Sequence, residues 1–188
     1  MRSLRQLPKK SRALKKVPYF SQKTLYTCGP ACARSVMAFF GKNKAPSEKR
    51  IATVAGTTLR AGTELAGLAK AISRLSGRKV SAKVFQRSEK NFIRALETSV
   101  RTGELAIVLL NRLAYDRKTP LLSRKTEWED RTHSNHFVIV LSASNESVLI
   151  SDPHKAVGRK KRIPTKTFLE SVIRSGKGSG NLLVCKRA

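Results

Sequence analysis

Cysteine and aromatic residues are scarce in this chain of 188 residues, and each scarcity excludes a class of protein. Its three cysteines (Cys28, Cys32 and Cys185) are too few and odd in number for a disulfide framework. We therefore expect free thiols in a reducing compartment. Aromatic residues make up only 6% of the chain, which argues against a base-stacking platform for single-stranded nucleic acid.

Long apolar runs are also absent. The most apolar stretches, 105–110 and 137–141, are far shorter than the roughly 20 residues that a membrane-spanning helix needs. The first 16 residues are interrupted by Lys and Arg throughout and lack the apolar core of a secretory signal, although an organelle transit peptide is an alternative. We expect no membrane span and no secretory signal, and a location in the cytoplasm or within a particle.

Positive charge dominates the sequence. The chain has 39 Lys and Arg against 12 Asp and Glu, a formal net charge of +27. A field of that sign attracts polyanions, so nucleic acid, an anionic membrane and acidic protein are all candidate partners. The cations are spread along the chain, with denser runs at 1–16 and 155–162. We read the second run as a solvated loop or as a bias toward acidic peptide substrates.

Apolar spacing predicts one domain at 17–188 that follows a flexible basic arm at 1–16. Helices come first, then strands, which predicts an α+β fold with an N-terminal helical half and a C-terminal antiparallel sheet. The polar stretch 112–135 has no apolar period and reads as a functional loop or lid. The expected helices are Cys28 to Gly41, Ser47 (N-cap) to Val54, Thr63 (N-cap) to Gly77, Ser88 to Gly103 and 165–173; the expected strands are 80–84, 104–111, 136–142, 147–151 and 181–185.

Cys28 is the strongest candidate for chemistry. Gly29 and Pro30 follow it and open a helix, so its sulfur would face the positive end of the helix dipole and several unpaired backbone N–H groups. That placement favours the thiolate, the nucleophilic form of the side chain. The alternative is a buried structural thiol, which is the expected state of Cys32 one turn later. Cys185, which closes the last predicted strand, is expected to be inert.

The base that a cysteine nucleophile needs must come from His133, His136 or His154. A hairpin centred on Ser144 places His136 opposite Asp152 on the same face. The carboxylate of Asp152 would then hold one ring nitrogen while the other meets the Cys28 thiol. His154 becomes the alternative base if the strand register slips.

An ordered set of motifs resembles the bacteriocin-processing cysteine peptidases, which cut leader peptides after a double glycine. The set consists of the segments 17–22 (VPYFSQ), 28–31 (CGPA), 56–58 (GTT), 62–63 (GT), 67–68 (GL), 136–140 (HFVIV) and 152–153 (DP). The resemblance implies a stand-alone domain of papain-like fold, with Cys28 as nucleophile, His136 as general base and Asp152 as the residue that orients it. It also implies that Gln22 joins the Cys28 N–H in an oxyanion hole.

We therefore expect a cysteine endopeptidase that acts on a peptide or protein through a Cys28 thioester, without a cofactor or metal. Two alternatives stay open: a catalytically silent module that binds nucleic acid or another polyanion on the same fold, and an acyltransferase or isopeptidase that uses the same site. A zinc site of Cys28, Cys32, His133 and His136 is a further alternative, although their spacing matches no strong zinc motif.

Overall fold

A computed structural model describes most of the chain. It covers residues 14, 16–41, 44–87, 89–111, 135–155, 157–158, 160–175 and 180–188. The predicted basic arm at 1–16, except Leu14 and Lys16, and the predicted loop at 112–135, except Asn135, lie outside these residues. His133 and most of the predicted glycine-rich turn at 176–180 lie outside them as well.

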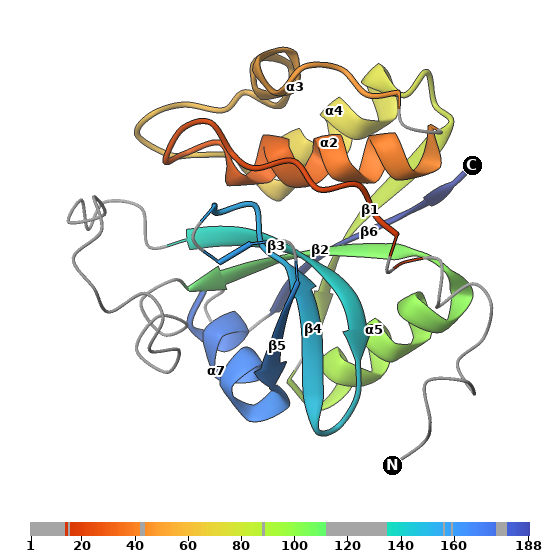
Figure 1. Cartoon of the computed structure of the whole chain (residues 1–188), viewed down its shortest axis with the longest axis vertical. Helices are drawn as coiled ribbons and strands as arrows, with labels where there is room; N and C mark the ends of the chain where they lie inside the picture. Colours follow the sequence, from red (N-terminus) through yellow and green to blue (C-terminus); the bar gives the residue numbers. More distant parts are fainter. Residues whose placement is uncertain are drawn as a thin grey trace.

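The first half of the chain forms three packed helices, as its apolar spacing predicts. Ser47 is the N-cap of the second, where its hydroxyl accepts a hydrogen bond from the Arg50 N–H at 3.3 Å. Figure 1 shows the three together on one side of the sheet. These helices are α2 (Cys28–Phe40), α3 (Glu48–Ala55) and α4 (Leu65–Leu75).

The start of α4 differs from the prediction. Its N-cap is Glu64, which makes no side-chain capping bond, and not Thr63. The hydroxyl of Thr63 is hydrogen-bonded instead to that of Thr57 at 2.8 Å. This bond closes the base of a small loop in which Thr58 and Gly62 exchange two backbone hydrogen bonds of 2.9 Å. Thr63 therefore stabilises a loop that lies beside the helices rather than a helix end.

The second half builds a sheet whose described strands are all antiparallel, in the order β1-β6-β2-β3-β4-β5. Two more helices, α5 (Glu89–Thr102) and α7 (Thr165–Ser175), lie on the side opposite α2 to α4 (Figure 1). This arrangement confirms the α+β fold. The strands are β1 (Val80–Arg87), β2 (Leu105–Asn111), β3 (Asn135–Ala143), β4 (Ser147–Ser151), β5 (Lys161–Pro164) and β6 (Gly180–Arg187).

Strand β5 corrects the interpretation of 155–162 as a solvated loop. Lys161 and Arg162 begin a strand that pairs with β4, where Ile150 faces Lys161 and Val148 faces Ile163. The side chain of Ile163 is fully buried, so one apolar residue in a basic run anchors this edge of the sheet. A single buried position leaves too short an apolar pattern to be recognised in the sequence.

The β3–β4 hairpin is also shifted from its predicted register. A hairpin centred on Ser144 pairs Ile139 with Leu149, whereas the observed ladder pairs Ile139 with Ser151. An irregularity between Val140 and Ser142 accommodates part of the difference. The shift is two residues at Ile139 and Val140, so the side chains on this side of the irregularity keep their predicted faces, because side chains alternate with a period of two.

The packing of α4 against α3 depends on one glycine. A Cβ atom at Gly67 would overlap the backbone carbonyl oxygen of Ala55, the last residue of α3. Glycine at this position therefore allows a close approach of the two helices that no other residue permits. The approach brings the loop at 57–63, which links the helices, close to the start of α2, where Thr63 lies against Gly29.

We predict that Gly67→Ala destabilises the protein by about 1–3 kcal/mol, the usual cost of overpacking. Helix propensity alone predicts the opposite sign, because alanine is about 1 kcal/mol more favourable than glycine inside a helix. Urea unfolding followed by circular dichroism measures the difference. The exposed neighbour Ala66 supplies the control, since Ala66→Gly should show only the propensity loss. A stabilised Gly67→Ala protein would contradict the proposed steric role.

Candidate active site

Cys28 is the first residue of α2, and the N-terminus of this helix has no side-chain cap. The N-cap residue Thr27 makes no side-chain capping bond. Its hydroxyl is engaged with Thr24 instead, at 2.9 Å from the Thr24 hydroxyl and 3.1 Å from the Thr24 N–H. The first turn also holds no acidic residue. The backbone N–H groups beside the Cys28 sulfur therefore keep their positive potential for a thiolate or an oxyanion.

The first two turns of α2 pack directly on β3. A Cβ at Gly29 would come within 3.1 Å of the Phe137 ring, so the absence of a side chain permits this contact. One turn further along, the Cys32 thiol donates a hydrogen bond to the Phe137 carbonyl at 3.5 Å. These contacts hold Cys28 next to His136, the neighbour of Phe137 in β3.

His136 and Asp152 form a buried pair. The Nε2 atom of His136 lies 2.7 Å from Oδ1 of Asp152, and the two residues are 6% and 0% exposed. The observed register makes them diagonal neighbours on one face of the hairpin rather than directly opposite residues. Because Nε2 is taken by Asp152, Nδ1 is the ring atom left to meet the Cys28 side chain, which also interacts with the imidazole.

The Asp152 carboxylate is fixed by its own loop. Its Oδ1 atom also accepts a hydrogen bond of 2.8 Å from the His154 N–H, and its backbone N–H donates to Gly158 at 3.3 Å. Oδ2 is buried and has no hydrogen-bond partner among the described residues. The alternative base, His154, thus contributes through its backbone to the orientation of Asp152, while His136 holds the position next to Cys28.

Opposing effects set the protonation of His136. Burial lowers the pKa of its imidazole, but the charge of Asp152, the hydrogen bond to Asp152 and the interaction with Cys28 raise the pKa. The raising effects together exceed the effect of burial and bring the pKa of His136 to about 10. An imidazolium that carries its proton at neutral pH is a suitable neighbour for a thiolate and a source of a proton for a leaving group.

Gln22 lies in the expected segment before α2, but its side-chain amide is directed at backbone carbonyl groups rather than at an oxyanion hole beside Cys28. Its Nε2 atom donates to the carbonyl oxygens of Thr24 and Leu25, at 2.8 and 3.4 Å. Its backbone N–H donates to Pro153 at 2.9 Å, next to Asp152. Gln22 thus links the segment before α2 to the loop of the carboxylate. Gln22 is buried, with 6% of its surface exposed.

Glu48 is a site neighbour that sequence reasoning missed. It is the first residue of α3 and only 3% exposed, and one carboxylate oxygen accepts a hydrogen bond from the Lys23 N–H at 2.9 Å. The acid therefore holds the backbone directly after Gln22. Acidic residues are common in the first turn of a helix and are usually exposed, so nothing in the sequence distinguished Glu48 as a buried residue. Only the packing of α3 reveals its burial.

The two other cysteines are buried, as predicted for Cys32. Burial raises the pKa of the Cys185 thiol, and burial followed by the charges of Cys28 and Asp152 raises the pKa of Cys32. Both groups therefore resist ionisation and reaction. Within the described residues no cluster of three His, Cys, Asp or Glu side chains is arranged to hold a metal ion, and no helix has the length and apolar character of a membrane span.

A narrow cavity opens next to Cys28. It has a volume of about 90 Å³ and is walled by the loop at 58–62 on one side and by the start of β3 on the other. Arg60 is the charged residue in its lining, and small residues, Ala61 and Gly62, form the wall beside it. The lining is completed by Leu25, Tyr26, Thr63, Leu109, Asn135 and Phe137. Such a space admits a small side chain and excludes a large one.

Comparison with known proteins gives a family and a fold. A sequence profile described as the Peptidase C39-like family matches residues 14–179. No curated protein sequence matches the chain.

Solved structures agree with the profile. The peptidase domain of Streptococcus ComA, a bifunctional ABC transporter of a quorum-sensing pathway, has a TM-score of 0.60 at 19% identity, with 92% of this chain and 98% of that chain covered. A C39-like peptidase from Bacillus anthracis has a TM-score of 0.66 at 17% identity, with 93% and 97% covered. A double-glycine motif protease from an AMS/PCAT transporter, in complex with its leader peptide, has a TM-score of 0.60 at 22% identity, with 93% and 94% covered. At these identities the likeness establishes a shared fold.

We predict that the imidazole of His136 stays protonated through neutral pH and that Asp152→Asn lowers its pKa from about 10 toward the ordinary range. The sign follows because the substitution removes the charge that raises the pKa and leaves the burial that lowers it. Titration of the histidine ring carbons by NMR measures both values, with His136→Gln used to assign the resonance. A pKa near 6.5 in both proteins would contradict the buried ion pair.

Proposed function

The chain belongs to the Peptidase C39-like family, and on that premise we propose that it is a cysteine endopeptidase that hydrolyses a peptide bond through a Cys28 thioester. The observation that carries the proposal is the position of His136, with Nε2 held 2.7 Å from Asp152 and the opposite side of the ring left for Cys28. Asp152 orients the ring and stabilises its positive charge. These roles explain why a charged pair is kept in a buried position.

In the proposed reaction, His136 holds the proton that it has taken from Cys28, and the sulfur attacks the carbonyl carbon of the substrate. The tetrahedral intermediate collapses as His136 gives that proton to the leaving amine, which leaves a thioester on Cys28. A water molecule then attacks the thioester while His136 takes its proton. The second tetrahedral intermediate collapses with cleavage of the C–S bond, which releases the carboxylic acid and restores the Cys28 thiolate beside protonated His136.

The developing oxyanion needs hydrogen-bond donors. The N–H of Cys28 is the first of α2 and has no partner within the helix. We assign the second donor to Gln22, whose bond to Leu25 is the longer of its two, at 3.4 Å, and is the one that a substrate oxygen would replace. The exchange leaves the 2.8 Å bond to Thr24 in place as an anchor. One donor of this kind typically contributes about 10²–10³ to kcat.

The substrate that we propose is a peptide segment with small residues next to the scissile bond. The cavity of about 90 Å³ beside Cys28 supports this size limit. Arg60 in its lining favours an acidic side chain nearby, because the described lining holds no acid to pair with it. The leader peptide bound by the AMS/PCAT protease is compatible with an extended peptide of this kind.

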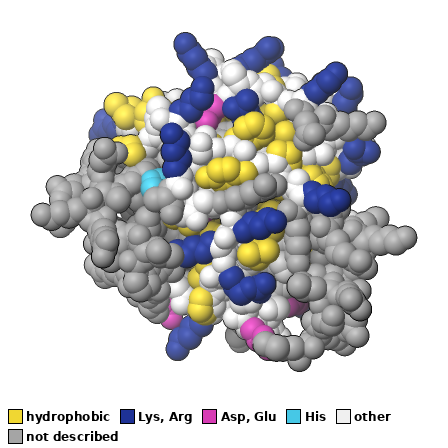
Figure 2. Space-filling view, viewed as in Figure 1, with side chains coloured by type: hydrophobic (Ala, Val, Ile, Leu, Met, Phe, Trp, Pro, Cys, Tyr) yellow, Lys and Arg dark blue, Asp and Glu magenta, His cyan; other side chains and the backbone are white. Residues whose placement is uncertain are grey.

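The rival functions use other features of the molecule. A polyanion-binding module without catalysis would rely on the net charge of +27. Figure 2 shows the described Lys and Arg side chains of one face dispersed among hydrophobic and neutral ones, so the described part of this face presents no concentrated basic patch. An acyltransferase or isopeptidase would share the thioester and differ only in the amine that accepts the acyl group.

Alkylation tests the nucleophile without knowledge of the substrate. We predict that iodoacetamide at pH 6 labels one cysteine, Cys28, and that His136→Ala slows this labelling by about tenfold or more, since the thiolate loses its cationic partner. Peptide mapping by mass spectrometry identifies the site. Cys32 and Cys185 serve as internal controls, because both are buried and their pKa values are raised. Slow labelling that is unchanged in His136→Ala would count against catalysis.

A peptide library tests the size limit and the role of Arg60. We predict cleavage after small residues, a preference for peptides with an acidic side chain nearby, and loss of that preference in Arg60→Gln with cleavage itself retained. Lys70→Gln removes the same charge from an exposed position on α4 and supplies the matched control. Ratios of kcat/KM for acidic and neutral peptides measure the effect. An equal drop in the two variants would show a general charge effect and would contradict the assignment to Arg60.

A further inference from the structure

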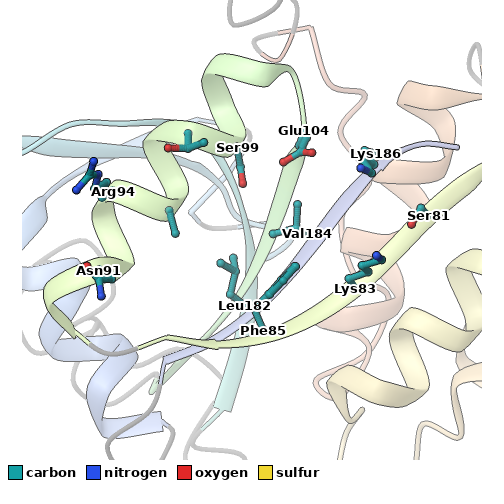
Figure 3. Close-up of a pocket in the computed structure, with 12 residues that line it drawn as sticks. Ser81, Lys83, Phe85, Asn91, Arg94, Ser99, Glu104, Leu182, Val184 and Lys186 are labelled. Atoms are coloured by element: carbon teal, nitrogen blue, oxygen red, sulfur yellow. The ribbon is translucent and has the colours of Figure 1, made fainter.

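A second cavity lies away from Cys28, on the side of the sheet that carries α5. It is an open groove of about 520 Å³ between α5 and the paired strands β1 and β6 (Figure 3). Helix α5 packs mainly over β2 and β3 and leaves this end of the sheet uncovered. The groove shares no lining residue with the cavity beside Cys28.

The floor of the groove is apolar. Phe85 of β1 faces Leu182 of β6 across the ladder, and Val184 of β6 is the next residue on the same face. Figure 3 shows these three side chains together between the two strands and α5. Phe85 and Val184 are half-buried, so the floor remains open to a ligand.

The sides of the groove are cationic. Lys83 faces Val184 and Lys186 faces Ser81, so the two lysines are diagonal neighbours on one face of the ladder, with Cβ atoms roughly 7–8 Å apart. Arg94 adds a third cation from α5. Among the described residues, no hydrogen bond or ion pair engages any of these three side chains. Glu104 is the acid in the described lining.

The two like charges on diagonal positions of the ladder repel each other, weakly because both side chains are exposed to water. An anionic group between Lys83 and Lys186 removes the repulsion and gains charge-assisted hydrogen bonds from both. An apolar chain attached to that group covers the half-buried side chains of Phe85 and Val184. The volume is within the range of small-molecule sites, which are apolar clefts with a few placed polar groups.

We propose that the groove between α5 and the β1–β6 ladder binds a single-chain amphiphile with an anionic head, whose head lies between Lys83 and Lys186 and whose chain lies on Phe85, Leu182 and Val184. A fatty acid and an alkyl phosphate both have this chemistry. A polynucleotide fits less well, because its phosphates would pair with the lysines but would leave the apolar floor without a partner.

Isothermal titration of the full chain with laurate and with dodecyl phosphate, below the concentrations at which they aggregate, tests the site. We expect one molecule bound per chain for at least one of the two, and their relative affinities distinguish a carboxylate source from a phosphate source. Two control ligands should bind at least about tenfold more weakly. Acetate has an anionic head without a chain, so it contacts only the lysines. Dodecyl maltoside has a chain with a neutral head, so it contacts only the apolar floor.

Two variants locate the binding. Lys83→Gln with Lys186→Gln should weaken it by about tenfold or more, and Ala95→Trp, which fills the α5 wall, should abolish it. Lys70→Gln with Lys166→Gln removes the same charge from exposed positions on α4 and α7 and should leave affinity unchanged. Circular dichroism confirms that each variant is folded, and Cys28→Ala should bind as the wild type does, whatever its peptidase activity.

Three results would overturn the proposal. The first is equal weakening in both double-lysine variants, which would show a general effect of net charge. The second is binding of dodecyl maltoside as tightly as laurate, which would show adsorption of chains without a role for the head. The third is binding of an acidic peptide at the groove with no binding of either amphiphile, which would identify a different class of ligand. None of these bears on the reaction at Cys28.

Discussion

The first turn of α2 lies against β3 through Gly29, where the missing side chain leaves room for the Phe137 ring. Cys32 then donates its thiol hydrogen to the carbonyl of the same phenylalanine, 3.5 Å away. The helix and the strand are thereby joined at the position where one carries Cys28 and the other His136. Every other feature of the site, including the loop of Asp152, is arranged around this contact between the helical half and the sheet.

Burial of the His136–Asp152 pair costs hydration free energy. Both residues are almost fully inaccessible, so their charges lose most of their hydration, and only a close geometry with extra hydrogen bonds offsets that loss. The 2.7 Å contact and the bond from the His154 N–H provide those interactions. Apolar residues would fill the space at lower cost. The presence of charge here is therefore better explained by chemistry than by stability.

The sequence predicted the structure accurately where the periodic spacing of side chains along a strand or helix determines it. The period of two placed His136 and Asp152 on one face although the hairpin register was wrong by two residues, because an even shift preserves the face. Local chemistry without a period was less informative. The direction of the Gln22 amide depends on the path of the chain at Thr24, and the burial of Glu48 depends on how α3 packs. Both are tertiary effects that no spacing encodes.

The charge of the chain and the charge of the site have separate physical roles. The net charge of the chain is +27, and most of the described Lys and Arg side chains are exposed to water and salt, where their field falls off within about 10 Å at moderate ionic strength. Asp152 and Glu48 are buried, so they act on their neighbours with little screening. Asp152 in the interior therefore raises the pKa of His136, while the many surface cations govern how fast acidic ligands arrive. For this reason a strongly basic protein is able to keep a negatively charged carboxylate pocket behind its imidazole, and its overall charge says little about its chemistry.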